Sequence, residues 1–233
     1  MKRLITTVIL CLLFSGCSSN ESFLRNRVVK LTGNGRLCSG EQIKAPSGIS
    51  YVLTAAHCLS TVDALGNVTI TKDDGTSLVR KVIAEDSNSD LLLIEGLPNV
   101  EGVKIASRSY RGEKVRTFTH GRGHSTYLTD GELLEDRRSR VVIFDITTPE
   151  REAYCRKFKK YLVASEMVFG LFPAKFCVIN VLETGTTANV QPGSSGGMVV
   201  DSSGALVGVV STGDGVYGGL VRLSDIKAFL AGY

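Results

Sequence analysis

The chain has 233 residues, enough for one large domain or two small ones. Its formal net charge is +4 and falls to about +2 if Lys2 and Arg3 are removed with a leader, which is too small to argue for a nucleic-acid partner. Two basic stretches, residues 137–140 and 156–160, are interpreted as solvated surface, with anionic lipid headgroups as an alternative contact for the second.

The first sixteen residues predict an export signal. A basic start precedes an apolar core over residues 4–14, too short to span a bilayer comfortably. Residues 14–17 read Phe-Ser-Gly-Cys and resemble a bacterial lipobox, with Phe where the pattern has Leu. The resemblance implies a signal over residues 1–16, a lipid on Cys17 and a tether over residues 17–27. Ordinary signal cleavage and a soluble secreted product are the alternative. We expect an envelope protein, anchored in a membrane and facing the periplasm or the exterior.

Short apolar runs separated by turns predict a chain made mostly of β-strands. The candidate strands of the first half are residues 28–31, 51–53, 68–70, 79–83 and 91–94. Those of the second half are residues 115–118, 141–144, 176–179, 198–200 and 206–210. Turns are predicted at residues 73–75 and 201–204. By itself this periodicity indicates an all-β sandwich or barrel.

The end of the chain carries a helical signal. Ser224 is a predicted N-cap, and the spacing of the apolar residues up to Leu230 is that of a helix. Residues 132–171 show no readable pattern and receive no predicted role.

Two motifs carry the chemistry. Residues 54–58 read Thr-Ala-Ala-His-Cys after an apolar run, which sets His57 beside a cysteine. Residues 192–197 read Pro-Gly-Ser-Ser-Gly-Gly and set Ser195 in a glycine-rich turn, where backbone amides can point at a bound oxygen. A serine hydroxyl is a poor nucleophile until a base takes its proton, and histidine is such a base near neutral pH. Together the motifs resemble those of the chymotrypsin/trypsin-like serine proteases, peptidase family S1.

The resemblance calls for a carboxylate between the two motifs. The family's aspartate opens a short apolar strand, and Asp90 before residues 91–94, Leu-Leu-Leu-Ile, fits that pattern. Asp86 lies four residues earlier with polar neighbours and is the alternative. Without the resemblance, Asp90 would be interpreted as a turn residue at the end of a loop.

The resemblance implies an all-β fold of two six-stranded antiparallel β-barrels, about residues 28–105 and 112–233, with a short C-terminal helix and the active site between the barrels. It also implies a serine endopeptidase that forms an acyl-enzyme on protein or peptide substrates and needs no cofactor. The triad would be His57, Asp90 and Ser195, with the amides of Gly193 and Ser195 as the oxyanion hole. A catalytically inactive surface binding protein on the same fold is the alternative function, and the intact triad argues against it.

Disulfides are expected in an exported domain with an even number of cysteines. Cys11 leaves with the signal and Cys17 carries the lipid. The remaining four, which allow three pairings, are Cys38, Cys58, Cys155 and Cys177. The family joins the cysteine after the histidine motif to one that precedes Ser-Gly on the strand before. The resemblance therefore implies a Cys38–Cys58 bridge, which leaves Cys155–Cys177 as the second.

The resemblance also implies which residues bind substrate. These are Asn189 at the base of the pocket, Ser211, Thr212 and Gly213 on the substrate-pairing strand, and Gly215 and Tyr217 on the pocket wall. Because Asn189 is uncharged, strong selection for Arg or Lys is not expected.

The sequence departs from the family at Ser194, and it predicts no metal site. Ser194 occupies the place where zymogen-type relatives have an aspartate that pairs with a newly cut N-terminus, so activation by that ion pair is not expected. Two glycines lie among the three residues between His120 and His124, which predicts a loop, and no metal site is predicted.

Overall fold

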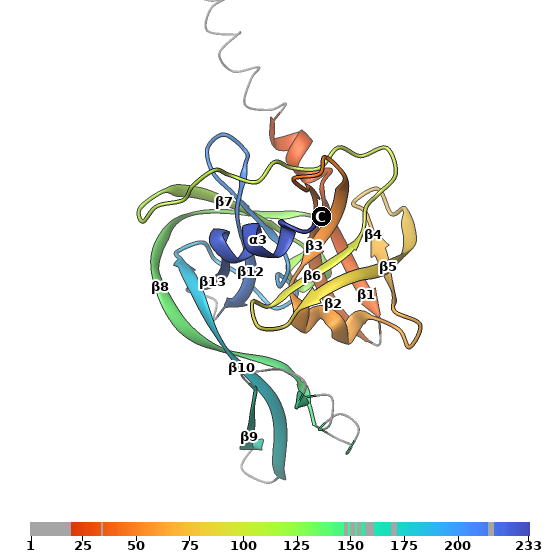
Figure 1. The fold of residues 1–233 in the computed structure, drawn as a ribbon, viewed down its shortest axis with the longest axis vertical. Helices are drawn as coiled ribbons and strands as arrows, with labels where there is room; N and C mark the ends of the chain where they lie inside the picture. The colour runs from red at the N-terminus through yellow and green to blue at the C-terminus, as the bar shows by residue number, and fades with distance from the viewer. Residues whose placement is uncertain are drawn as a thin grey trace, which may run out of the picture.

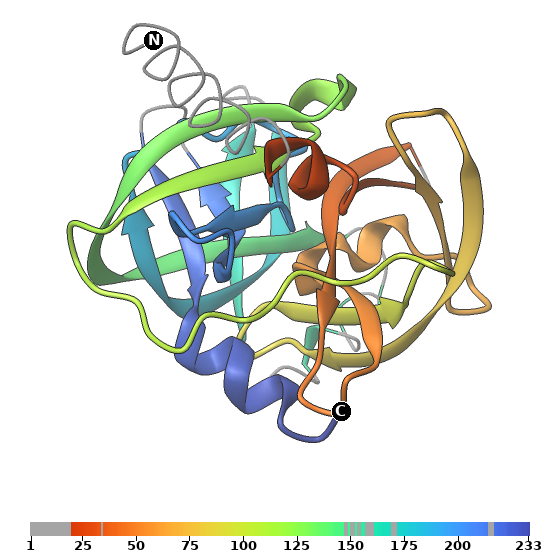
Figure 2. The ribbon, with the colours of Figure 1, turned by 90° about the horizontal axis from the view of Figure 1, so that it is seen from above.

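The computed structural model describes residues 20–33, 35–146, 149, 152, 155, 156, 161–168, 172–213 and 217–233. Two β-structures lie side by side and the chain passes from the first to the second through residues 96–113 (Figures 1 and 2). No helix within these ranges is both long enough and apolar enough to cross a bilayer.

The first half forms a closed six-stranded barrel in the order β1-β2-β3-β6-β5-β4, with every pair antiparallel. Its strands are β1 (Val28–Gly33), β2 (Arg36–Lys44), β3 (Ser50–Thr54), β4 (Asn67–Thr71), β5 (Ser77–Asp86) and β6 (Leu91–Glu95). Strand β4 shows the alternation that builds it, because Val68 and Ile70 are buried while their polar neighbours are not. Inside the barrel these two side chains join Val52, Leu92 and Ile94 in one apolar cluster.

The second half forms a seven-stranded sheet in the order β13-β12-β11-β7-β8-β10-β9. Its strands are β7 (Lys114–Thr119), β8 (Tyr127–Asp145), β9 (Tyr161–Val168), β10 (Phe172–Thr186), β11 (Met198–Val200), β12 (Leu206–Gly213) and β13 (Gly218–Arg222). An extra pairing between β13 and β10 closes six of these strands into a second barrel, and β9 is added outside the ring. The predicted pair of six-stranded barrels is therefore confirmed, with one additional strand.

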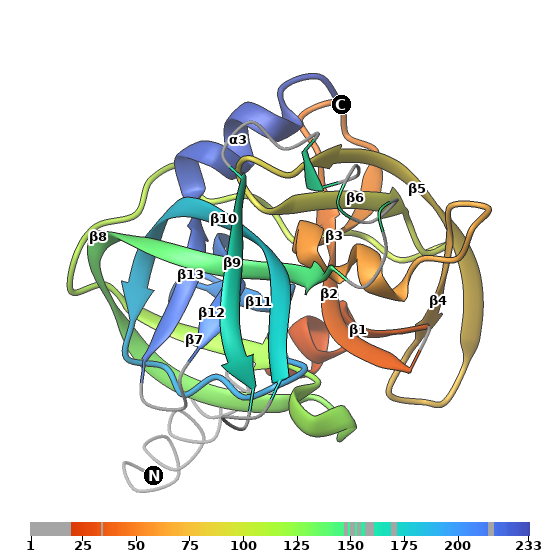
Figure 3. The same cartoon turned by 90° about the horizontal axis from the view of Figure 1, so that it is seen from below.

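The stretch that the sequence left unread, residues 132–171, holds most of β8, the longest strand among the described residues, and ends just before β10. Strand β8 has 19 residues and β10 has 15, and their far halves project from the barrel with β9 as an arm (Figure 1). Residues 135–138 of β8 are exposed, so the strand alternates too little in hydrophobicity to be recognised. Figure 3 shows the far end of β8 crossing toward η1 (Ala56–Thr61), the 3₁₀-helix after β3, which it contacts.

A second apolar cluster joins the two barrels. Leu53 and Leu93 from the first barrel pack with Phe118, Met198 and Val209 from the second, and all five are fully buried. Burying side chains of this size stabilises a fold by roughly 1.5–3 kcal/mol each before entropic costs. The two barrels are therefore held in one relative position, and the residues at their seam keep fixed distances.

The chain ends in a helix, α3 (Leu223–Leu230), as predicted, but with a different cap. The N-cap is Arg222 rather than Ser224, and it makes no side-chain capping bond. Its guanidinium instead pairs with Asp225 in the first turn, at 2.7 Å. Both predicted turns are confirmed, because Gly75 and Gly204 adopt positive φ angles of 84° and 83° between the paired strands.

Candidate active site

His57 lies near the start of η1, immediately after β3. A disulfide between Cys38 and Cys58 ties η1 to β2, which confirms the predicted pairing, as does the second bridge between Cys155 and Cys177. The side chain of His57 is 14% exposed, so one edge of the ring remains open to solvent or a ligand.

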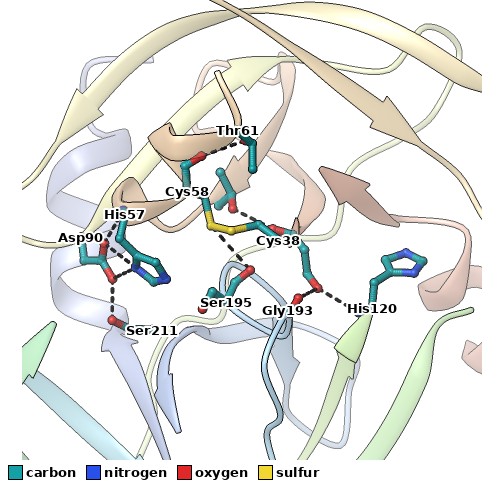
Figure 4. Close-up of a disulfide and its surroundings, with 11 residues drawn as sticks. Cys38, His57, Cys58, Thr61, Asp90, His120, Gly193, Ser195 and Ser211 are labelled. Carbon is teal, nitrogen blue, oxygen red and sulfur yellow. Dashed lines mark hydrogen bonds and ion pairs between the residues drawn. A yellow bond between two sulfur atoms is a disulfide. The ribbon is translucent and has the colours of Figure 1, made fainter. Parts of the chain in front are cut away.

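Asp90 is the acid that the structure brings to His57. Its Oδ2 lies 2.9 Å from Nδ1 of His57, and its Oδ1 accepts the backbone N–H of His57 at 2.9 Å (Figure 4). The hydroxyl of Ser211 donates a further hydrogen bond to Oδ2. Asp90 is fully buried and has φ 57°, a backbone conformation that aspartate adopts more readily than most residues. Asp86, the alternative, instead accepts the N–H of Asn88 at 3.0 Å.

Ser195 lies in the loop between β10 and β11, which packs against the first barrel. Its carbonyl accepts the N–H of Ser39 at 2.8 Å, and the next amide, that of Gly196, donates to the carbonyl of Val210 at 2.7 Å. A Cβ atom at Gly196 would lie 1.9 Å from Oγ1 of Thr54, so only glycine allows this approach. In Figure 4 the imidazole of His57 is turned toward Ser195.

Gly193 has both of its peptide groups fixed. The preceding carbonyl, of Pro192, accepts the N–H of Arg122 at 2.8 Å. Because the C=O and N–H of a trans peptide point in opposite directions, the N–H of Gly193 points away from Arg122. The carbonyl of Gly193 accepts the hydroxyl of Ser39 at 2.8 Å.

The residues assigned to substrate binding by resemblance fall in different surroundings. Ser211, Thr212 and Gly213 end β12, and Ser211 reaches Asp90. Gly215 lies outside the described residues, and Tyr217 is 44% exposed. Asn189 was expected at the base of a pocket, but it is exposed. Its backbone carbonyl accepts the hydroxyl of Thr129 at 3.0 Å.

The neighbouring residue, Val190, has the buried side chain of the pair. It is 2% exposed, and its Cγ2 lies 2.1 Å from where a Cβ on Gly213 would be and 3.2 Å from where one on Gly218 would be. These two glycines are paired on β12 and β13. The side chain of Val190 thus fills the space beside both strands. The sequence analysis did not name Gly218, because only the register of β13 against β12 brings it opposite Gly213.

The pKa of His57 is raised above its usual value. Burial by itself lowers this pKa, because it penalises the imidazolium, but the charge and hydrogen bond of Asp90 and the more distant charge of Glu183 outweigh it. Glu183 lies on β10 and is 1% exposed, and its Oε2 accepts the hydroxyl of Thr212 at 2.9 Å. The sequence analysis did not single out Glu183. The strand predicted in this region ended at residue 179, whereas β10 continues to Thr186.

Of the two histidines weighed as a metal pair, His120 has partners at its ring. Nδ1 of His120 lies 2.9 Å from the carbonyl of His124. The carboxylate of Asp73 lies 3.7 Å from the same ring nitrogen. In the part of the chain that the structure describes, no three His, Cys, Asp or Glu side chains gather in a way that could hold a metal ion.

Comparison with solved structures finds the same fold. The Rv3671c protease of M. tuberculosis in its inactive form superposes with a TM-score of 0.62 at 19% sequence identity, over 91% of each chain. Its active form gives the same TM-score and identity over 91% of this chain and 82% of that one. An inactive-form serine-to-alanine mutant from strain H37Rv gives 0.63 at 18% identity, over 91% and 89%.

At the level of sequence, none of the curated proteins compared with this chain matches it significantly. A family model does match: that of the trypsin-like peptidase domain aligns with residues 33–209, which is most of the chain. This range contains His57, Asp90 and Ser195. The protein therefore belongs to the trypsin-like peptidase family.

Proposed function

We propose that this protein is a serine endopeptidase that uses Ser195 as nucleophile, His57 as base and Asp90 as the carboxylate that orients the base. The observation that supports this most strongly is the binding of Nδ1 of His57 by the buried carboxylate of Asp90. With Nδ1 occupied, the other ring nitrogen is left for the hydroxyl of Ser195, toward which the ring is turned.

In the proposed reaction, Oγ of Ser195 attacks the carbonyl carbon of the peptide bond while His57 accepts its proton. The amides of Gly193 and Ser195 hold the oxyanion that forms. His57 then gives the proton to the leaving amine, and the C–N bond breaks to leave an acyl group on Ser195. A water molecule, deprotonated by His57, releases the carboxylic acid and restores the serine. Asp90 holds the proton on Nδ1 throughout and stabilises the imidazolium.

Cleavage of an unfolded protein such as casein, followed by mass spectrometry of the products, tests this function. We expect wild type to cut it and Ser195→Ala to lose roughly 10⁶ in kcat. Ser202→Ala, at an exposed serine in a turn, is the control and should cut as wild type does. A wild-type protein that cuts nothing would contradict the proposal and favour a non-catalytic binding protein.

We infer that the substrate side chain next to the cut site must be small, because Val190 fills the space beside Gly213 and Gly218. Val190→Ala removes two methyl groups from this space. For peptides that differ only at this residue, we expect the ratio of kcat/KM for leucine over alanine to rise about tenfold or more. Val207 lies on β12 and belongs to the same apolar cluster as Val190. As the control, Val207→Ala should leave the ratio unchanged. An unchanged ratio in Val190→Ala would exclude Val190 as the limit on size.

The pH dependence of the reaction follows from His57. The imidazole accepts a proton only when it is neutral, so kcat/KM should fall as pH drops through the pKa of His57, which lies above the ordinary value of about 6.5. Because the charge of Glu183 helps to raise this pKa, Glu183→Gln should move the acidic limb to lower pH. The exposed carboxylate of Glu135 gives the control, and Glu135→Gln should leave the limb in place. An unmoved limb in Glu183→Gln would show that Glu183 does not act on His57.

We also propose that the protein is exported and anchored through a lipid on Cys17. The support is the apolar leader and the lipobox-like residues 14–17; Cys17 itself lies outside the described residues. Two or three acyl chains hold a protein on a membrane firmly, whereas one does so marginally. Cys17→Ser should move the protein from the membrane fraction to a soluble or unprocessed form, and Cys11→Ser, within the leader, should not. An unmodified mature N-terminus in the intact mass would contradict the anchor.

A further inference from the structure

Ser39 contacts both ends of the segment that carries the nucleophile. It is fully buried on β2, next to the bridged Cys38. Its hydroxyl donates to the carbonyl of Gly193 at 2.8 Å and accepts the N–H of His120 at 2.8 Å (Figure 4). Its own N–H donates to the carbonyl of Ser195 at 2.8 Å. One residue of the first barrel thus holds Gly193, Ser195 and a loop of the second barrel at once.

A second pair of hydroxyls holds the same segment from the other side. Ser194 is 1% exposed, and its hydroxyl donates to Oγ1 of Thr119 at 3.0 Å. The hydroxyl oxygen of Ser194 also accepts the N–H of Gln191 at 3.2 Å, which closes the turn that leads to Gly193. Thr119 ends β7 and immediately precedes His120, so both sets of contacts end on neighbouring residues at the end of that strand. We call Ser39, Thr119 and Ser194 the hydroxyl clamp.

The chain upstream of β1 is packed against the rest of the fold. Leu24 is 4% exposed and belongs to the cluster between the barrels. The guanidinium of Arg25 donates to the carbonyl of Thr126 at 2.7 Å. A cut before Val28 would remove both contacts, and the side chain at position 194 carries no charge to receive an ammonium group.

We propose that the hydroxyl clamp, and Ser39 above all, positions the oxyanion hole in this protein without any charged group or N-terminal cleavage. The inference rests on the proposed function and names residues that act through Gly193 rather than on the substrate. The peptide planes before and after Gly193 can rotate about its φ and ψ angles, and such a rotation can turn the Gly193 N–H away from the oxyanion. Arg122 holds the plane before Gly193 by binding the carbonyl of Pro192, and Ser39 holds the plane after it by binding the carbonyl of Gly193.

Ser39→Ala tests the proposal directly. Loss of a whole oxyanion donor typically costs about 10²–10³ in kcat. Since Ser39 acts at one remove, we expect kcat to fall roughly tenfold to a hundredfold, with KM within about threefold of wild type. The affinity for a peptide aldehyde should fall by a similar factor, because its adduct with Ser195 places an oxyanion or hydroxyl in the same hole. If Ser39 served only folding, its replacement would change neither kcat nor the affinity for the aldehyde at a temperature where the variant is folded.

Two further variants keep the test decisive. Thr117→Val removes an equally buried hydroxyl for which the described residues offer no hydrogen-bond partner, and it should behave as wild type. Ser194→Ala breaks the other side of the clamp and should reproduce the loss in kcat, which decides the matter if Ser39→Ala does not fold.

Two results would overturn the inference in distinguishable ways. Wild-type kcat and aldehyde affinity in a folded Ser39→Ala or Ser194→Ala overturn the clamp alone. A wild-type protein that neither cuts peptides nor binds the aldehyde overturns the proposed function and the clamp with it.

Discussion

Replacing Asp90 by asparagine is expected to lower kcat by about 10⁴ while the protein stays folded. The carboxylate accepts hydrogen bonds from Nδ1–H of His57 and from the hydroxyl of Ser211. An asparagine amide can donate to Nδ1 instead, which would place the proton on the nitrogen that must receive one from Ser195. Steady-state hydrolysis of one peptide substrate, compared at equal concentrations of folded enzyme, measures the effect.

Asp86→Asn is the matched control, because both aspartates flank the same turn between β5 and β6. Asp86 only accepts a backbone N–H of that turn, so its loss should change kcat by no more than a few-fold. The assignment of the acid would be wrong if the two variants lost activity equally, or if Asp86→Asn lost more.

Removing the Cys38–Cys58 bridge is expected to lower both stability and activity. The bridge closes a loop with a sequence separation of 20, which is worth about 3 kcal/mol of unfolding free energy in the chain-entropy model. It also joins η1, which carries His57, to β2, which carries Ser39. Cys38→Ala with Cys58→Ala should therefore lower kcat even at temperatures where the variant is fully folded. Denaturant unfolding and peptide hydrolysis measure the two effects separately.

The second bridge provides the comparison. Cys155–Cys177 has a sequence separation of 22, so its removal should cost about the same free energy of unfolding. It joins Cys155 to Cys177 on β10 and does not connect η1 with β2. Cys155→Ala with Cys177→Ala should therefore destabilise the protein while kcat changes much less. Equal losses of kcat in the two double variants would show that the Cys38–Cys58 bridge has no special role at His57.

Five of the six strands of the first barrel were predictable from the sequence, because they alternate or are short and apolar. Residues 68–70 and 91–94, for example, were identified inside β4 and β6. Strand β2 was not predicted, since buried polar residues such as Glu41 and Gln42 interrupt its apolar pattern. Strand β13 was not, since it begins with two glycines that carry no pattern. Strand β8 was recognised only at residues 141–144, because residues 135–138 in its middle are exposed and charged.

For the site, the sequence identified what short motifs can encode. His57, Ser195 and the two disulfides follow from residues near one another in the chain, together with the family resemblance. The partners of Gly193 could not be found in this way, because Ser39 lies 154 residues away and touches it only after both barrels have formed. Asn189 was expected at the base of a pocket, but Asn189 is exposed and the neighbouring Val190 is buried. A count along the motif cannot say which of two neighbouring side chains points between β12 and β13.

The measurement that tests the central claim most directly is labelling of the purified protein with a fluorophosphonate, followed by peptide mapping. The reagent reacts with a serine hydroxyl only where a base activates it. The account predicts one adduct on Ser195 in wild type, strong suppression of it in His57→Ala, and none in Ser195→Ala. Equal labelling of Ser195→Ala and wild type, or no adduct on wild-type Ser195 in the folded protein, would contradict it.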